Sequence, residues 1–123
     1  MDKIRVLLID DEEEFTSALA ERLSLRGIAA STSSSGEEAL KMIESSPPPD
    51  VIILDLMMPG LSGVEILTRI KKKMPDVRVI FLTGHGSPEI GEGQMNMGSC
   101  EYLIKPVKIE DLIERIRSAA MGP

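Results

Sequence analysis

The chain has 123 residues, a hydrophobic fraction of 42% and a formal net charge of −6. This length is enough for one core and too short for two, while the acidic balance argues against a nucleic-acid-binding face. The single cysteine, Cys100, excludes an intrachain disulfide framework, and no apolar run approaches the roughly 20 residues of a membrane span, so we expect a soluble, cytoplasmic, single domain over residues 1–123.

Five segments are predicted to be parallel strands. Three of them are continuously apolar and rich in β-branched residues, which is typical of strands that are covered on both faces. The other two are weaker, since the earlier one consists mostly of Ala, Ser and Thr. The predicted strands span residues 4–9, 28–33, 51–54, 77–82 and 100–104.

Helical patterns lie between these strands. Apolar residues recur at helical spacing over residues 15–23, and Gly27 supplies a stop signal. Capping boxes of the Ser-x-x-Glu type, at residues 35–38 and 62–65, begin the next two helices. A continuous apolar stripe over residues 109–120 predicts the last helix.

The segment before the last predicted strand gives a poorer signal. Ser87 and Pro88 form a good helix start, but Gly91 and Gly93 weaken the interior, so we expect a short or mobile helix over residues 87–98. Strands and helices thus alternate five times, which predicts an α/β fold with a doubly wound, five-stranded parallel sheet. Ligands of such sheets bind at the carboxyl ends of the strands.

Polar side chains follow four of the predicted strands. Asp10 and Asp11 end the first strand, Asp55 the third, Thr83 the fourth and Lys105 the fifth. Because parallel strands end at one edge of the sheet, these groups are expected to lie together. Clustered carboxylates repel one another and favour a cation, and oxygen ligands suit Mg²⁺. A bound Mg²⁺ makes the site receptive to a phosphoryl group, which a carboxylate can accept as an aspartyl phosphate.

A simpler interpretation is that acids beside a helix start only complement the helix N-terminus. It accounts for Glu12, Glu13 and Glu14. It does not account for Asp55 at the end of an apolar strand, or for Lys105 at the same edge. We therefore prefer the phosphoryl-acceptor interpretation.

Four motifs in chain order resemble the receiver domain of two-component response regulators, in its chemotaxis-regulator-like form. They are residues 8–13 (LIDDEE), 54–60 (LDLMMPG), 82–85 (LTGH) and 102–106 (YLIKP). The resemblance covers essentially the whole chain and implies a flavodoxin-like sheet of order 2-1-3-4-5 with five helices. It implies a phosphorylation-dependent signalling switch rather than an enzyme, although such a domain can catalyse its own phosphorylation from small phosphodonors and its own dephosphorylation.

The resemblance also implies roles for the residues of the acidic edge. Asp55 would be the phosphoacceptor, with a sensor histidine kinase or a phosphotransfer protein as the donor. Asp11, Asp55 and the backbone carbonyl of Met57 would ligate Mg²⁺, and Asp10 would act through a bound water. Lys105 would pair with the phosphoryl oxygens.

The same resemblance implies a switch. Thr83 would hydrogen-bond the phosphoryl group, and Tyr102 would turn inward as Thr83 moves. The peptide bond between Lys105 and Pro106 would be cis. The changed surface, formed by the fourth helix, fifth strand and fifth helix, would control a downstream effector protein or an effector domain missing from this chain, and dimerisation on phosphorylation is left open.

Several positions depart from the family pattern or tune it. Gly91 and Gly93 stand where the fourth helix is expected, and Lys108 stands where the last helix usually has an N-capping residue. Met57 and His85 are implied to tune the phosphoryl lifetime by controlling water access. His85 could also serve as a proton donor or phosphohistidine, but a lone loop histidine is more often a solvated neighbour of a site.

Three other functions are weighed against the switch. A degenerate receiver would act as a protein-binding module without phosphorylation, which the intact acidic edge argues against. A metal-dependent phosphatase with an aspartyl nucleophile, like the haloacid dehalogenases, would need a second Asp at Met57. A flavin carrier would need a Ser/Thr/Gly phosphate loop, where residues 10–14 are all acidic.

Overall fold

The computed structural model describes residues 3–45, 47–55, 63–83 and 100–121. Five parallel strands form one sheet in the order β2-β1-β3-β4-β5, which confirms the predicted fold class. Each strand lies within one residue of its predicted range. The strands are β1 (Arg5–Ile9), β2 (Ala29–Ser33), β3 (Val51–Leu54), β4 (Arg78–Thr83) and β5 (Cys100–Ile104).

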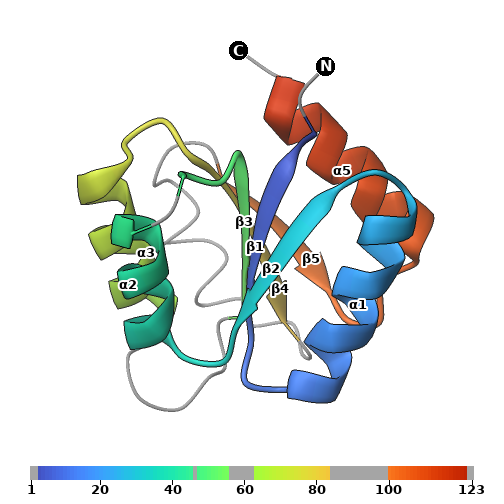
Figure 1. Cartoon of the computed structure of the whole chain (residues 1–123), viewed down its shortest axis with the longest axis horizontal. Helices are drawn as coiled ribbons and strands as arrows, with labels where there is room; N and C mark the ends of the chain where they lie inside the picture. The colour runs from blue at the N-terminus through green and yellow to red at the C-terminus, as the bar shows by residue number, and fades with distance from the viewer. Residues whose placement is uncertain (1–2, 46, 56–62, 84–99, 122–123) are drawn as a thin grey trace.

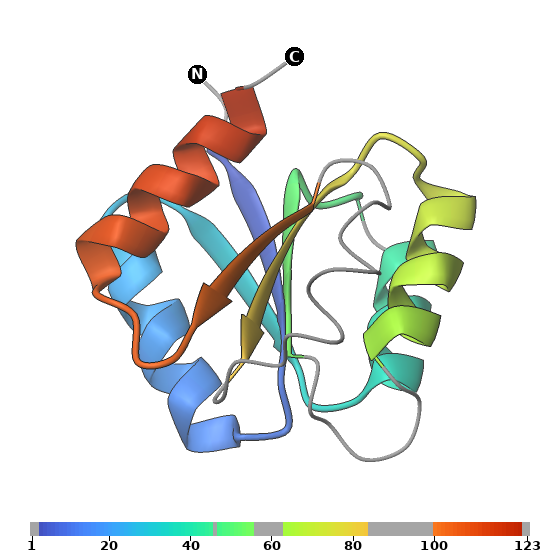
Figure 2. The ribbon, with the colours of Figure 1, turned by 180° about the vertical axis from the view of Figure 1, so that it is seen from behind.

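The described helices cover both faces of the sheet (Figure 1, Figure 2). On one face lie α1 (Glu13–Leu25) and α5 (Ile109–Met121), and on the other lie α2 (Gly36–Ser45) and α3 (Gly63–Lys73). No helix in this part of the chain is both long and apolar enough to cross a lipid bilayer. The helix predicted over residues 87–98 and the Ser that begins the capping box at residues 62–65 lie outside the described residues.

Successive residues of the central strands face opposite helical layers. Leu7 of β1 and Ile52 of β3 pack in the cluster with α2 and α3, whereas Leu8 and Ile53 pack in the cluster with α1 and α5. All four side chains are buried. Because both faces are covered, neither face of these strands tolerates a polar residue, which explains their continuous apolar sequence.

The structure shows the predicted signals at two helix boundaries, the end of α1 and the start of α2. Gly27 follows α1 with φ +82°, the left-handed conformation that ends many helices. At α2, the N–H of Glu38 donates to Oγ of Ser35 at 3.1 Å, as the capping box predicts. The Glu38 carboxylate accepts instead from Oγ of Ser33 and the N–H of Ser34, so the reciprocal half of the box is replaced.

Lys108 stands directly before α5. Its carbonyl accepts a helical hydrogen bond from the N–H of Leu112 at 3.0 Å, so it occupies the capping position that the sequence indicated. Glu110 and Asp111 in the first turn place negative charge at the same helix end and offset the lysine.

Candidate functional site

Two buried carboxylates stand at the carboxyl edge of the sheet. Asp10 follows β1 and Asp55 follows β3, and these strands are neighbours. The N–H of Asp10 donates to the carbonyl of Ser33 at 3.0 Å, and the N–H of Asp55 donates to the carbonyl of Ile9 at 2.9 Å. The sheet pattern thus continues one residue beyond each strand and holds both backbones firmly. The two residues are only 4% and 5% exposed.

Asp11 completes an acidic group. Carboxylate oxygens of Asp10, Asp11 and Asp55 all lie within 4.8 Å of one another, with Asp11 on the exposed side. Like charges at this separation repel by about 4 kcal/mol at an effective dielectric constant near 20. A hard divalent cation would remove this repulsion, and an all-oxygen donor set with one open side fits Mg²⁺, which retains several waters. The structure thus brings together the three aspartates that the sequence placed at this edge.

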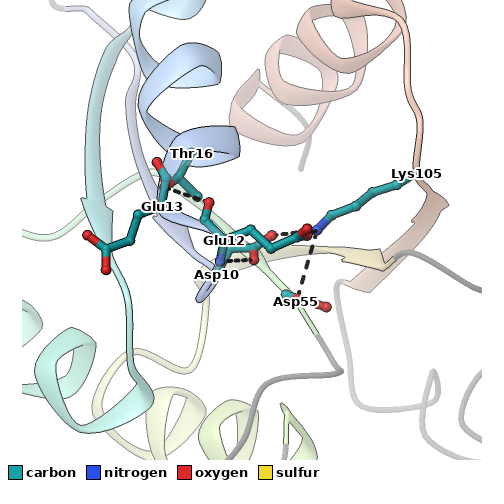
Figure 3. Close-up of polar contacts among 6 residues, drawn as sticks. All are labelled: Asp10, Glu12, Glu13, Thr16, Asp55 and Lys105. Atoms are coloured by element: carbon teal, nitrogen blue, oxygen red, sulfur yellow. Dashed lines mark hydrogen bonds and ion pairs between the residues drawn. The ribbon is translucent and has the colours of Figure 1, made fainter.

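Lys105 reaches the same group from the loop after β5 (Figure 3). Its Nζ lies 2.7 Å from Oδ2 of Asp10 and 3.9 Å from Oδ2 of Asp55, and its side chain is 12% exposed. Burial by itself would lower the pKa of Lys105. The hydrogen bonds to Asp10 and Glu12 and the charges of Asp10 and Asp55 outweigh that effect and raise its pKa above the usual value. The lysine is therefore a permanent cation over the acceptor candidate.

Two contacts of Lys105 were missed by the sequence argument. Its Nζ lies 2.5 Å from Oε1 of Glu12 and 4.4 Å from the ring centroid of Phe15, a cation–π distance. The sequence assigned Glu12 to the helix start and Phe15 to the apolar face of α1. The sequence places Glu12 directly after Asp11, at the same edge as the oppositely charged Lys105, but it does not specify the direction of the long Glu12 side chain.

The remaining predicted site residues are only partly described. Thr83 ends β4 and pairs in register with Ile104, so its backbone lies at the acidic edge, but its side chain is outside the described part. Tyr102 is partly buried and packs against the core on the side of α2 and α3. The Lys105–Pro106 peptide bond is cis, the isomer that the resemblance implies. Met57 and His85, which are predicted to tune the phosphoryl lifetime, lie outside the described residues.

Fold and site together define a doubly wound α/β domain with an acidic group at the carboxyl edge of its sheet, and comparison with known proteins identifies its family. Residues 6–117 match the family "Response regulator receiver domain". The chain is 33% identical over 115 residues to "Response regulator MprA" of Mycobacterium tuberculosis, covering 94% of this chain and 50% of that protein. It is 39% identical over 116 residues to "Probable transcriptional regulator ycf27" of Guillardia theta, covering 94% and 45%.

Solved structures agree. A response regulator receiver domain protein from Clostridium thermocellum superposes with a TM-score of 0.88 at 40% identity, covering 95% of this chain and 94% of that one. The response regulator TrrA from Thermotoga maritima, solved in complex with Mg²⁺ and BeF, gives 0.83 at 34% identity, covering 94% and 98%. The chain belongs to the response regulator receiver domain family.

Family membership sets the class of function. A receiver domain is the phosphoacceptor switch of a two-component response regulator, not an enzyme that turns over a substrate. This family assignment argues against the phosphatase and the flavin carrier among the alternatives. The chain spans about half the length of the curated relatives that it matches, at 50% of MprA and 45% of the ycf27 product.

Proposed function

We propose that this domain accepts a phosphoryl group on Asp55 in a Mg²⁺-dependent reaction, with a sensor histidine kinase or a phosphotransfer protein as the donor. One observation carries the proposal: a buried Asp55 shares an acidic group with Asp10 and Asp11 and has a lysine ammonium 3.9 Å away. The presence of Mg²⁺ and BeF in the related TrrA supports a metal site of the same kind.

The donor set suggests how the metal would be held. Asp11, Asp55 and the carbonyl of Met57 would ligate Mg²⁺, and Asp10 would act through a water. Bound there, Mg²⁺ would supply positive charge to the phosphoryl oxygens. The chain's own contribution is to hold the three carboxylates close together and to keep two of them away from solvent.

In the proposed transfer, an Asp55 carboxylate oxygen forms a bond to phosphorus while the bond from phosphorus to the donor nitrogen breaks. The electron pair of the broken bond stays on that nitrogen. Lys105 carries three N–H donors, of which Asp10 and Glu12 accept two. Its 3.9 Å separation from Asp55 is too long for a hydrogen bond, so at least one donor of Lys105 is available for a phosphoryl oxygen on Asp55.

The proposed output follows from the position of β5. Thr83 would hydrogen-bond the new phosphoryl group, and Tyr102 would move further inward. The surface of the fourth helix, β5 and α5 would then change for an effector, either a separate protein or a domain of the same chain, or for a second copy. Ile104 of β5, half exposed, already offers an apolar contact there.

We propose that residues 1–123 form one such domain, acting in the cytoplasm without direct nucleic-acid or membrane contact.

The test uses a small phosphodonor. The protein is incubated with acetyl phosphate, with Mg²⁺ or with EDTA, and its intact mass is measured. We expect one phosphoryl adduct that requires Mg²⁺, is absent from Asp55→Asn and is retained by Asp76→Asn, which removes an exposed acid from the turn before β4. A wild-type protein without the adduct would favour the degenerate, binding-only receiver, and an adduct that persists in Asp55→Asn would remove the acceptor assignment.

A further inference from the structure

We propose that Glu12 is a positioning residue that holds Lys105 in the site when a divalent cation occupies the aspartates. The inference rests on the Mg²⁺ site of the proposed function and adds a residue that is not itself a ligand. Three carboxylates surround the ammonium of Lys105, at 2.7 Å for Asp10, 2.5 Å for Glu12 and 3.9 Å for Asp55.

These three carboxylates differ in what else they can bind. Asp10 and Asp55 belong to the group whose oxygens converge within 4.8 Å, and Glu12 does not. A cation held by the converging oxygens therefore competes with Lys105 for Asp10 and Asp55, but leaves Glu12 to the lysine. Among the described carboxylates that pair with Lys105, Glu12 alone lies outside the group that would bind the metal ion. Lys105 can therefore keep Glu12 as its partner when the metal ion is bound.

The backbone of Glu12 is fixed on both sides. Its N–H donates to Oδ1 of Asp10 at 2.9 Å, and its carbonyl accepts from the N–H of Thr16 at 3.0 Å, which opens α1. Glu12 occupies the N-cap position of α1, yet its side chain makes no capping hydrogen bond there. It extends instead across the site to Lys105, whereas the side chain of Glu13 points away (Figure 3). Glu is not among the residue types that cap helix N-termini well, so the Glu12 side chain contacts Lys105 without taking part in capping α1.

Burial explains why Lys105 needs such a partner. Its side chain is 12% exposed, while that of Glu12 is 62% exposed. A buried ammonium that loses its counter-ions is strongly unfavourable, so Lys105 would resist a cation that draws Asp10 and Asp55 away. With Glu12 in place, the ammonium stays neutralised from the solvent side, and the aspartates are released for the metal.

The test measures binding of Mg²⁺ alone to the full chain by isothermal titration calorimetry, with no phosphodonor. Glu12→Gln keeps an acceptor oxygen but removes the charge. Lys105 then has only the aspartates as charged partners and competes more strongly with Mg²⁺ for them. We expect the Kd for Mg²⁺ to rise about fivefold. Glu13→Gln is the matched control, because it removes an equal charge from the next residue without touching Lys105, and its Kd should stay within about twofold of wild type.

A double-mutant cycle separates this role from a simple charge effect. Lys105→Met removes the competing ammonium, and in that background Glu12→Gln should change the Kd no more than Glu13→Gln does. An unchanged Kd in Glu12→Gln, or the same rise with and without Lys105, would overturn the inference while leaving the Mg²⁺ site intact. A wild-type protein that binds no Mg²⁺ would overturn both the metal site of the proposed function and this inference.

Discussion

Ion pairs of similar length occur in two very different regions of this molecule. On the surface of α3, Arg69 and Glu65 meet at 2.8 Å with about half of each side chain exposed. At the carboxyl edge of the sheet, Lys105 and Asp10 meet at 2.7 Å and are almost buried. Water screens the charges of the first pair, because both side chains are half exposed. At the edge, one ammonium faces several carboxylates, so a net negative charge remains and is available for binding a cation and for chemistry.

Removing the cation of the buried group should have the largest effect on stability. In EDTA, Lys105→Met is expected to lower the free energy of unfolding by about 3 kcal/mol, because Asp10 and Asp55 are left crowded and uncompensated. Urea unfolding measures this, and added Mg²⁺ should recover much of the loss. A loss no greater than that of a surface variant such as Arg69→Ala would break the comparison between the two regions.

Removing an acid from the same group should act in the opposite direction. In EDTA, Asp55→Asn is expected to raise the free energy of unfolding by about 1 kcal/mol, since it relieves repulsion among the three aspartates. Thermal or urea unfolding provides the measurement. The gain should vanish at saturating Mg²⁺, which stabilises wild type more than the variant. Asp76→Asn, at an exposed turn, should change little in either buffer.

Breaking the surface ion pair should change the free energy of unfolding least among these stability effects. Arg69→Ala is expected to cost about 0.5 kcal/mol or less, because the Glu65–Arg69 contact is half exposed and follows i, i+4 helix geometry. The same urea experiment should show that even this small loss declines in high salt. A cost comparable with that of Lys105→Met would mean that burial does not distinguish the two regions.

The smallest expected effect is a titration rather than a stability change. The hydrogen bond and the charge of Lys73 hold the pKa of Glu44 below the usual range of a glutamate. The contribution of the pair to stability is therefore present above the ordinary pKa and is lost as the pH falls through the lowered one. Carboxyl NMR of Glu44 should show a return to the ordinary pKa in Lys73→Gln and no change in Lys72→Gln. If the pKa of Glu44 is the same in Lys73→Gln as in wild type, the pair does not form in solution.

The fold was predictable where burial is uniform along an element. Val51–Leu54 is apolar at every position because both of its faces are covered, and it was assigned correctly from that pattern alone. The edge strand Ala29–Ser33 gave a weak signal, since only Ser33 among its residues is buried. An edge strand is held largely by its ladder to β1, which leaves no pattern in side-chain hydropathy.

The site was predictable as far as topology determines it. The residues that follow parallel strands lie at one edge of the sheet, so the sequence predicted that Asp10, Asp55 and Lys105 lie close together. The contact between Glu12 and Lys105 joins residues 93 positions apart and depends on the direction of one long side chain, which no local pattern specifies. For the same reason the replaced half of the capping box, where Glu38 turns to Ser33, could not be foreseen.

The identity of the phosphorylated residue decides between an acceptor switch and a binding-only module. After reaction with acetyl phosphate and Mg²⁺, borohydride reduction converts an aspartyl phosphate to homoserine, and peptide mass spectrometry locates the change. We predict homoserine at position 55 alone, absent from samples treated with EDTA. Reduction at Asp10 or Asp11, or no reduced residue after Mg²⁺-saturated reaction, would contradict Asp55 as the phosphoacceptor.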